Sequence, residues 1–172
     1  DNNTRTLTGN GVPNHAVTGG KFASKISAQT VNKSFSLSPE KTENATILRE
    51  PGYALNSVKF EPATAGTCPD TAENDKTCDY GAGSDTWKMV ALPGDTSPWK
   101  FDFGVDKSNA HVQPTGAYHY HGIPEKLLLK INGSSTTTMT LTGWAADGFP
   151  IYARYGYTNP TDSSSVLKIL KS

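Results

Sequence analysis

The chain has 172 residues with sixteen basic and sixteen acidic side chains, so its formal charge at pH 7 is zero. This length suits one domain that buries a hydrophobic core without needing several disulfides. The balanced charge argues against nucleic acid or an anionic membrane as a partner, since both usually require a basic patch. No apolar run is long enough to span a bilayer, so we expect no membrane span, and nothing in the sequence indicates a protein partner.

The first third of the chain is predicted to be β-structure. Apolar residues alternate with polar neighbours over residues 22–28 and again over 35–37, which is the period of a half-buried strand. Residues 45–61 predict another pair of strands, interrupted by turn-forming residues at 51–52 and 56–57.

Both cysteines, Cys68 and Cys78, lie in a polar loop that we expect over residues 62–86. A bond between them would close a short loop and stabilise the protein by about 2–3 kcal/mol. Cysteines that bind metal more often stand closer together or come with a second pair, so a disulfide is favoured, by analogy with secreted proteins. This pairing and the many Asn, Thr and Ser residues indicate a secreted or periplasmic protein.

The second half of the chain mixes a helix with further strands. Residues 87–92 fit a strand or a short helix equally well. Proline followed by an acidic residue predicts a helix over 124–129, which a later glycine ends. Residues 136–142 alternate as a strand does, and the Asp-Gly pair at 147–148 is typical of a hairpin turn.

Two segments resemble each other, Gly52–Phe60 and Gly143–Ile151. Both read Gly-aromatic-Ala, then a turn-forming pair, then apolar residues two apart. Our hypothesis is two equivalent hairpins related by a pseudo-twofold axis, although two short segments can also agree by chance. We expect one mainly β, sandwich-like domain over residues 1–172, with one or two short helices. Its last apolar segment, 166–171, stops next to the final residue, which indicates an interrupted element.

Three of the four histidines lie within eleven residues. Side chains on a strand alternate between faces, so His119 and His121 share one face while Tyr118 and Tyr120 share the other. The two imidazoles start roughly 6.6 Å apart, close enough to bind the same ion. His111 lies upstream across a turn and is expected to supply the next ligand, so this stretch predicts a metal site.

The remaining histidine, His15, is a candidate fourth ligand, although an ordinary loop residue is the stronger interpretation. Three imidazoles without a thiolate suit zinc or copper(II), and the lack of a matching carboxylate pair argues against a calcium or magnesium site. The alternative for all of these histidines is hydrogen bonding to backbone or solvent without a metal.

Carboxylates are expected near the ligands, because a ligating histidine normally donates its other N–H to a carboxylate or a carbonyl. The candidates are Asp102, Asp106, Glu125 and Asp147. Asp147 is explained first as a turn residue and Glu125 as a charge at a helix N-terminus. The sequence therefore assigns no catalytic residue.

The histidine stretch and two further motifs resemble a known family. Gly116–Pro124, which reads GAYHYHGIP, and Gly143–Tyr152, which reads GWAADGFPIY, look like the YHYH-domain proteins of bacteria. The segments 109–114, 12–15 and 54–62 are also similar, except that the family commonly has Gly where this chain has Ser57. The resemblance covers about residues 10–157 and implies no particular activity. Members usually continue beyond the second motif, which implies truncation or processing of this chain.

Three functions are compatible with these patterns. The first is a secreted or periplasmic protein that binds, stores or delivers a transition metal, copper or zinc, through the histidine cluster. The second is a metal-dependent enzyme, a hydrolase or an oxidase, which needs an open coordination position. The third is a metal-free ligand-binding or adhesion module.

Overall fold

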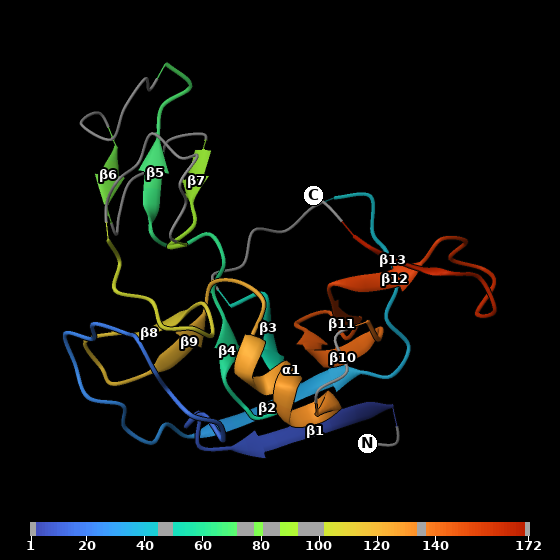
Figure 1. The fold of residues 1–172 in the computed structure, drawn as a ribbon, viewed down its shortest axis with the longest axis horizontal. Helices are drawn as coiled ribbons and strands as arrows, with labels where there is room; N and C mark the ends of the chain where they lie inside the picture. The colour runs from blue at the N-terminus through green and yellow to red at the C-terminus, as the bar shows by residue number, and fades with distance from the viewer. Residues whose placement is uncertain are drawn as a thin grey trace.

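The chain forms four β-sheets and one helix in the part that the structure describes (Figure 1). The structure is a computed structural model and describes residues 3–44, 50–71, 78–80, 87–92, 102–133 and 137–170. Its elements are β1 (Thr4–Gly9), β2 (Val31–Ser36), β3 (Gly52–Ala54), β4 (Lys59–Phe60), β5 (Gly66–Cys68), β6 (Asp79–Tyr80), β7 (Trp87–Met89), β8 (Ala110–Val112), β9 (Tyr118–Tyr120), α1 (Glu125–Asn132), β10 (Thr140–Ala145), β11 (Pro150–Ala153), β12 (Tyr155–Tyr157) and β13 (Leu167–Ile169). The prediction of a mainly β protein with a short helix is confirmed.

A six-stranded sheet forms the centre, in the order β11-β10-β3-β4-β9-β8. Of its strand pairs, β4 and β9 are parallel and the others are antiparallel. One face of strands β4, β8 and β9 is packed with α1 into the largest core cluster. The buried residues of this cluster are Ala54, Val58, Phe60, Ala110, Val112, Tyr118, Tyr120 and Leu127.

A local twofold relation joins the hairpins β3–β4 and β10–β11, as the internal repeat predicted. Their inner strands are antiparallel neighbours, and Tyr53 lies opposite Trp144 at the centre of the pairing. The hairpins share their register, because Gly52 pairs with Phe60 as Gly143 pairs with Ile151. The turns match as well, since three backbone hydrogen bonds of the first hairpin recur in the second. Ala54 N to Val58 O corresponds to Ala145 N to Phe149 O, and Ser57 N to Ala54 O corresponds to Gly148 N to Ala145 O. The bond that joins the hairpins, Leu55 N to Thr142 O, corresponds to Ala146 N to Pro51 O.

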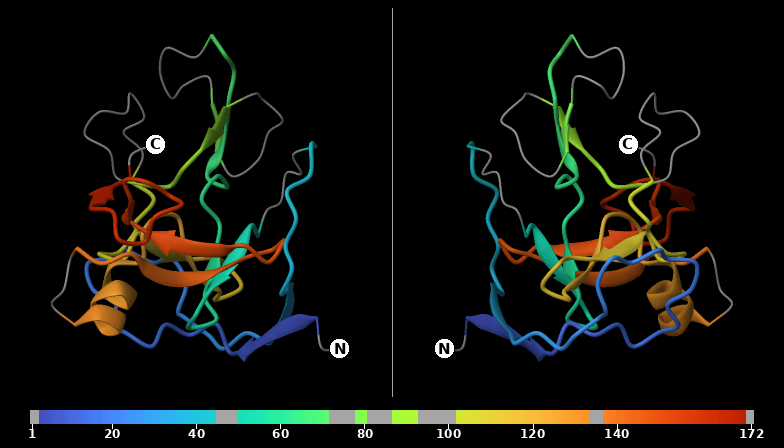
Figure 2. Two further views of the ribbon diagram at one scale, coloured as in Figure 1. Left: turned by 90° about the vertical axis from the view of Figure 1, so that its right-hand side faces the viewer. Right: turned by 90° about the vertical axis from the view of Figure 1, so that its left-hand side faces the viewer.

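The three smaller sheets pack around this centre or extend from it. The sheet β6-β5-β7 stands away from the six-stranded sheet in all three views (Figures 1 and 2). The expected disulfide between Cys68 and Cys78 is present there and links the end of β5 to the residue before β6. Cys68 lies in a second apolar cluster that includes Met89 and Phe103, so this sheet is tied to the loop that leads into β8.

Several local predictions agree with the structure. The helix begins after Pro124 and ends at Asn132, and the following Gly133 has a φ of 61°, which favours glycine. The Asp-Gly pair at 147–148 forms the turn between β10 and β11. The segment 87–92 contains the strand β7, which decides between the two alternatives.

Two strand predictions were wrong in position. Residues 22–28 form no strand. Ser27 N donates to Gly116 O, and Lys21 N, just before the segment, donates to Gly104 O, so the backbone here bonds to separate loops. The alternation there reflects Phe22 and Ile26 packing on the central core from an irregular segment. The strand expected at 136–142 starts at Thr140, and residues 45–49 and 134–136 lie outside the described part. Within that part, no helix has the length and apolar character needed to cross a bilayer.

Candidate metal centre

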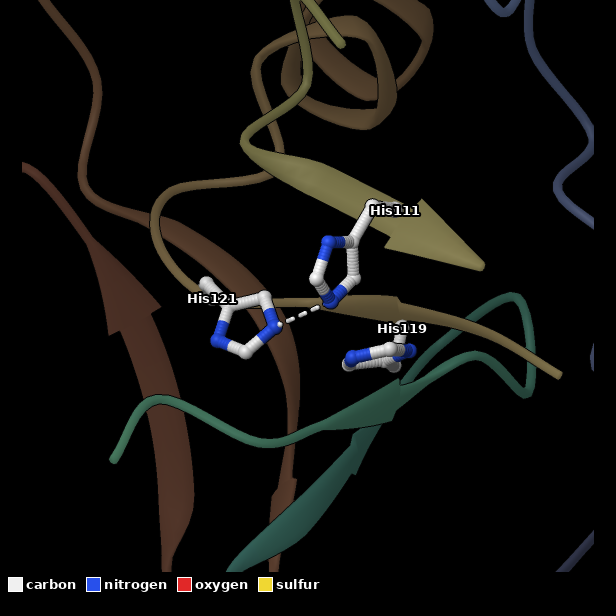
Figure 3. Close-up of side chains that lie close together, drawn as sticks. All are labelled: His111, His119 and His121. Carbon is white, nitrogen blue, oxygen red and sulfur yellow. Dashed lines mark hydrogen bonds between the residues drawn. The ribbon is translucent and has the colours of Figure 1, made fainter. Parts of the chain in front are cut away.

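His111, His119 and His121 converge on one face of the central sheet (Figure 3). His111 on β8 lies directly opposite His119 on β9, and His121 comes directly after β9, two residues beyond His119. The ring centroids are 4.6 Å apart for His111 and His119 and 4.7 Å apart for each pair that includes His121. The strand alternation that placed His119 and His121 on one face is therefore correct, and strand pairing adds His111.

The other face of β9 carries the two tyrosines of the motif, and it is the core face. The Tyr118 hydroxyl donates to Asp106 at 2.7 Å, and burial together with this carboxylate raises the pKa of Tyr118. Tyr120 is fully buried, and burial raises its pKa as well. The alternating motif thus divides into a tyrosine side that builds the core and a histidine side that builds a polar site.

Backbone carbonyls fix the tautomers of two of the histidines. His111 Nδ1 lies 2.8 Å from the Phe103 carbonyl, and His119 Nδ1 lies 3.2 Å from the Ala117 carbonyl. A carbonyl oxygen accepts and never donates, so each Nδ1 must carry the proton. In the neutral ring, Nε2 then has a free lone pair, and this nitrogen is the one that can bind a metal ion.

The contact between His111 and His121 also favours a cation between them. Their Nε2 atoms lie 3.1 Å apart. When the His111 ring is neutral, its Nε2 is a lone pair, so His121 must donate if no ion intervenes. That tautomer makes His121 Nδ1 an acceptor, yet this buried atom has no hydrogen-bond partner of normal geometry among the described residues. An ion at Nε2 would let Nδ1 carry the proton. The backbone carbonyl of Pro62 lies near this ring and acts to raise its pKa, as an acceptor for that proton does.

Burial keeps two of the three rings neutral. His119 and His121 are 1% and 3% exposed, whereas His111 is partly exposed. Burial disfavours the imidazolium and lowers the pKa of His119 to about 3 and that of His121 to about 4, and the neighbouring histidines lower both further. Both rings are therefore unprotonated at neutral pH, which is the ligating form.

The three rings have the spacing of a metal site. One ring nitrogen from each histidine lies within 4.8 Å of one from each of the others. Ligands of a zinc ion bond at about 2.0–2.1 Å, so a small inward shift of the rings would complete three bonds. The described residues thus offer a set of three imidazoles that could hold a transition metal.

Glu61 is a neighbour of the site that the sequence did not predict. It is 5% exposed, and its Oε2 lies 3.6 Å from His119 Nε2. Lys59 Nζ donates to Glu61 Oε1 at 2.6 Å, and Gln113 Nε2 donates to Oε2 at 2.7 Å. The sequence contained one signal for this: Lys59 and Glu61 flank the core residue Phe60, so both lie on the face opposite the core. That this face adjoins the histidines follows only from the parallel pairing of Lys59 with His119.

His15 lies elsewhere, on the tyrosine side of β9. Its Nε2 lies 2.7 Å from the Tyr120 hydroxyl, and its Nδ1 lies 3.1 Å from the Ala16 carbonyl. The same hydroxyl accepts a bond from Asn56 Nδ2 at 3.0 Å. The group of converging histidines does not include His15.

The four candidate carboxylates have partners other than the three histidines. Asp102 is exposed and pairs with Lys21. The carbonyl that His111 faces belongs to its neighbour Phe103. Asp106 accepts from Tyr118 and from backbone N–H groups on the core side. Glu125 pairs with Arg154, and exposed Asp147 accepts from Phe149 N in its turn. In this structure, backbone carbonyls fill the role that we expected carboxylates to have.

A model of the YHYH protein family matches residues 32–172. Because this match covers most of the chain, the chain belongs to that family, as the sequence motifs indicated. The match includes His111, His119 and His121, and His15 lies before it. No curated protein and no solved structure matches the chain, so the site must be interpreted from its own geometry.

Proposed function

For this member of the YHYH family, we propose that the function is to bind a transition metal ion through His111, His119 and His121. The observation that carries the proposal is the convergence of three imidazoles. The Nδ1 atoms of His111 and His119 face backbone carbonyls, and the buried Nδ1 of His121 lacks a hydrogen-bond partner, which an ion at Nε2 would relieve. Imidazole ligands suit zinc and copper(II), and we propose one of these two as the ion.

We further propose that the protein works outside the cytoplasm, in a secreted or periplasmic setting. The disulfide between Cys68 and Cys78 supports this location, because such bonds persist in oxidising compartments and are rare in the cytosol. Metal ligands must be unprotonated to bind an ion, and two of these three histidines have strongly lowered pKa values.

Elemental analysis of protein purified without a histidine tag tests the proposal. After incubation with zinc or copper and removal of excess ion, the wild-type chain should retain about one ion per molecule. The double variant His119→Ala/His121→Ala should retain none, whereas His15→Ala should retain the wild-type amount, because His15 lies on the other side of the sheet. A wild-type protein that retains no ion, or a double variant that retains it fully, contradicts the proposal and favours a metal-free module.

A further inference from the structure

We infer that Glu61 is the fourth ligand, so that the site is a closed centre of three imidazoles and one carboxylate. This inference rests on the proposed metal function and goes beyond it. A closed centre argues against the alternative of an enzyme with an open coordination position. A site with four protein ligands lacks the position that a substrate or a reactive water needs.

The distance between Glu61 and His119 is that of two ligands on one ion. Their Oε2 and Nε2 atoms are 3.6 Å apart, and two ligands bonded at about 2.0–2.1 Å in a tetrahedral arrangement lie roughly 3.3 Å apart. Glu61 does not belong to the group of atoms that already lie within 4.8 Å of one another. Ligation therefore requires a modest inward movement of its carboxylate as well as of the rings.

The protonation pattern shows why a cation fits between these two atoms. His119 Nδ1 carries the proton that points to the Ala117 carbonyl, so the neutral ring turns a lone pair toward the carboxylate. His119 Nε2 and Glu61 Oε2 lie 3.6 Å apart, and two lone pairs that face each other in a buried place repel. A metal ion bound by both atoms removes this repulsion.

Neighbouring side chains hold Glu61 as a ligating carboxylate is usually held. Lys59 Nζ donates to Oε1, Gln113 Nε2 donates to Oε2, and Lys59 also donates to Gln113 Oε1 at 2.9 Å. Sheet alternation puts Lys59, Glu61 and Gln113 on the histidine side, because Lys59 pairs with His119 and His119 pairs with His111. Both Glu61 oxygens are thus fixed, and Oε2 keeps a lone pair toward the ring of His119.

The ligand set also defines the kind of ion. A carboxylate adds one negative charge and a hard oxygen to three borderline nitrogens, a combination that favours a divalent cation such as Zn²⁺ and disfavours Cu⁺. We therefore expect the site to prefer zinc over reduced copper.

A zinc titration of matched glutamate variants tests the inference. Glu61→Gln keeps the size of the side chain and removes the charge, and should weaken zinc binding by about 10- to 100-fold in competition with a chromophoric chelator. Glu50→Gln is the control, since Glu50 Oε1 also lies near Lys59 Nζ, at 3.6 Å, but Glu50 Oε2 binds Lys33 and the Tyr53 hydroxyl. It should change the affinity less than twofold. Glu61→Asp, which restores the charge, should recover part of the loss.

The outcomes separate this inference from the proposed function. If the wild-type chain binds zinc and a folded Glu61→Gln variant binds it within twofold of wild type, Glu61 is not a ligand and the three-histidine site stands. If the wild-type chain binds neither zinc nor copper(II), both fail together. Should Glu61→Gln not fold, the visible spectrum of cobalt(II) in the wild-type protein decides: intense bands support four-coordinate binding, and weak bands typical of six-coordinate cobalt overturn the closed centre.

Discussion

The hairpins β3–β4 and β10–β11 have nearly equivalent backbones. Among the described residues, however, a candidate metal centre lies beside β3–β4 and none lies beside β10–β11. The two turns use the same side-chain bond, from Val58 N to Asn56 Oδ1 and from Phe149 N to Asp147 Oδ1, each at 3.3 Å. The difference arises at the outer strands. Strand β4 pairs with β9 and becomes internal, whereas β11 ends the sheet.

The side chains of the outer strands reflect this difference. When Gly52 is aligned with Gly143, Lys59 and Glu61 correspond to Pro150 and Tyr152. Lys59 and Glu61 have side-chain exposures of 14% and 6%, whereas Pro150 and Tyr152 are exposed. Proline has no N–H to donate and is confined mainly to edge strands. The comparison suggests that the repeat builds the scaffold and that the strand added beside β4 builds the site.

Among the substitutions, the largest effect is expected where the two hairpins meet. A methyl group at Gly143 would lie 2.2 Å from the Tyr53 carbonyl oxygen, and one at Gly52 would lie 2.5 Å from that of Trp144. Each of Gly143→Ala and Gly52→Ala should lower the free energy of unfolding by about 3 kcal/mol in urea titrations. Gly133→Ala is the control, since it has positive φ but no atom within 4 Å, and should cost about 1 kcal/mol. A clear loss at one of the two sheet glycines and none at the other would break the equivalence.

Metal-linked stabilisation should distinguish the surroundings of β4, where His119 lies opposite Lys59, from those of β11. With free zinc at about 100 times Kd, the free energy of unfolding of the wild-type chain should rise by about 2.7 kcal/mol. His119→Ala should remove this gain, whereas Tyr152→Ala, at the counterpart of Glu61, should keep it. Thermal or urea unfolding with zinc and with a chelator measures the gain, and its persistence in His119→Ala would refute the assignment.

The ion-free protein should lose stability in mild acid. The native pKa values of His119 and His121, about 3 and about 4, lie below the unfolded value of about 6.5. Between these values the unfolded chain binds protons that the native chain does not, so stability falls as pH falls from about 6.5 to 4, by up to about 1.4 kcal/mol per pH unit for each ring. Urea unfolding over this pH range in a chelator should show the slope in the wild-type chain and a smaller one in His119→Gln. An unchanged slope in that variant would mean that other groups cause it.

The smallest effect is expected at the turn residue Ser57. Its φ is 65° and that of its counterpart Gly148 is 97°, a region that favours glycine. Ser57 keeps this conformation while its buried hydroxyl accepts a bond from Gly11 N at 3.0 Å. Ser57→Gly relieves the backbone strain but loses this bond, and each contributes about 1 kcal/mol. The net change in the free energy of unfolding should stay below about 1 kcal/mol, and a larger loss would show that the hydroxyl dominates.

What the sequence predicts well in this protein is local. The turn at 147–148, the helix after Pro124 and the shared face of His119 and His121 depend on neighbouring residues, and all three agree with the structure. The internal repeat also gave the two hairpins, because turn residues and alternation recur at the same spacing in both.

What the sequence did not predict depends on pairing between distant segments. Glu61 reaches the site because β4 lies parallel to β9, and no local pattern fixes that register. The irregular segment around Phe22 alternates like a strand, yet its backbone bonds go to separate loops. His15 gave no local sign that Tyr120 would be its partner.

The most direct test is a crystal structure of the zinc-loaded protein with anomalous data collected at the zinc edge. We predict one strong peak within about 2.0–2.1 Å of Nε2 of His111, His119 and His121. No peak at saturating zinc, or a peak away from these three rings, would contradict the account.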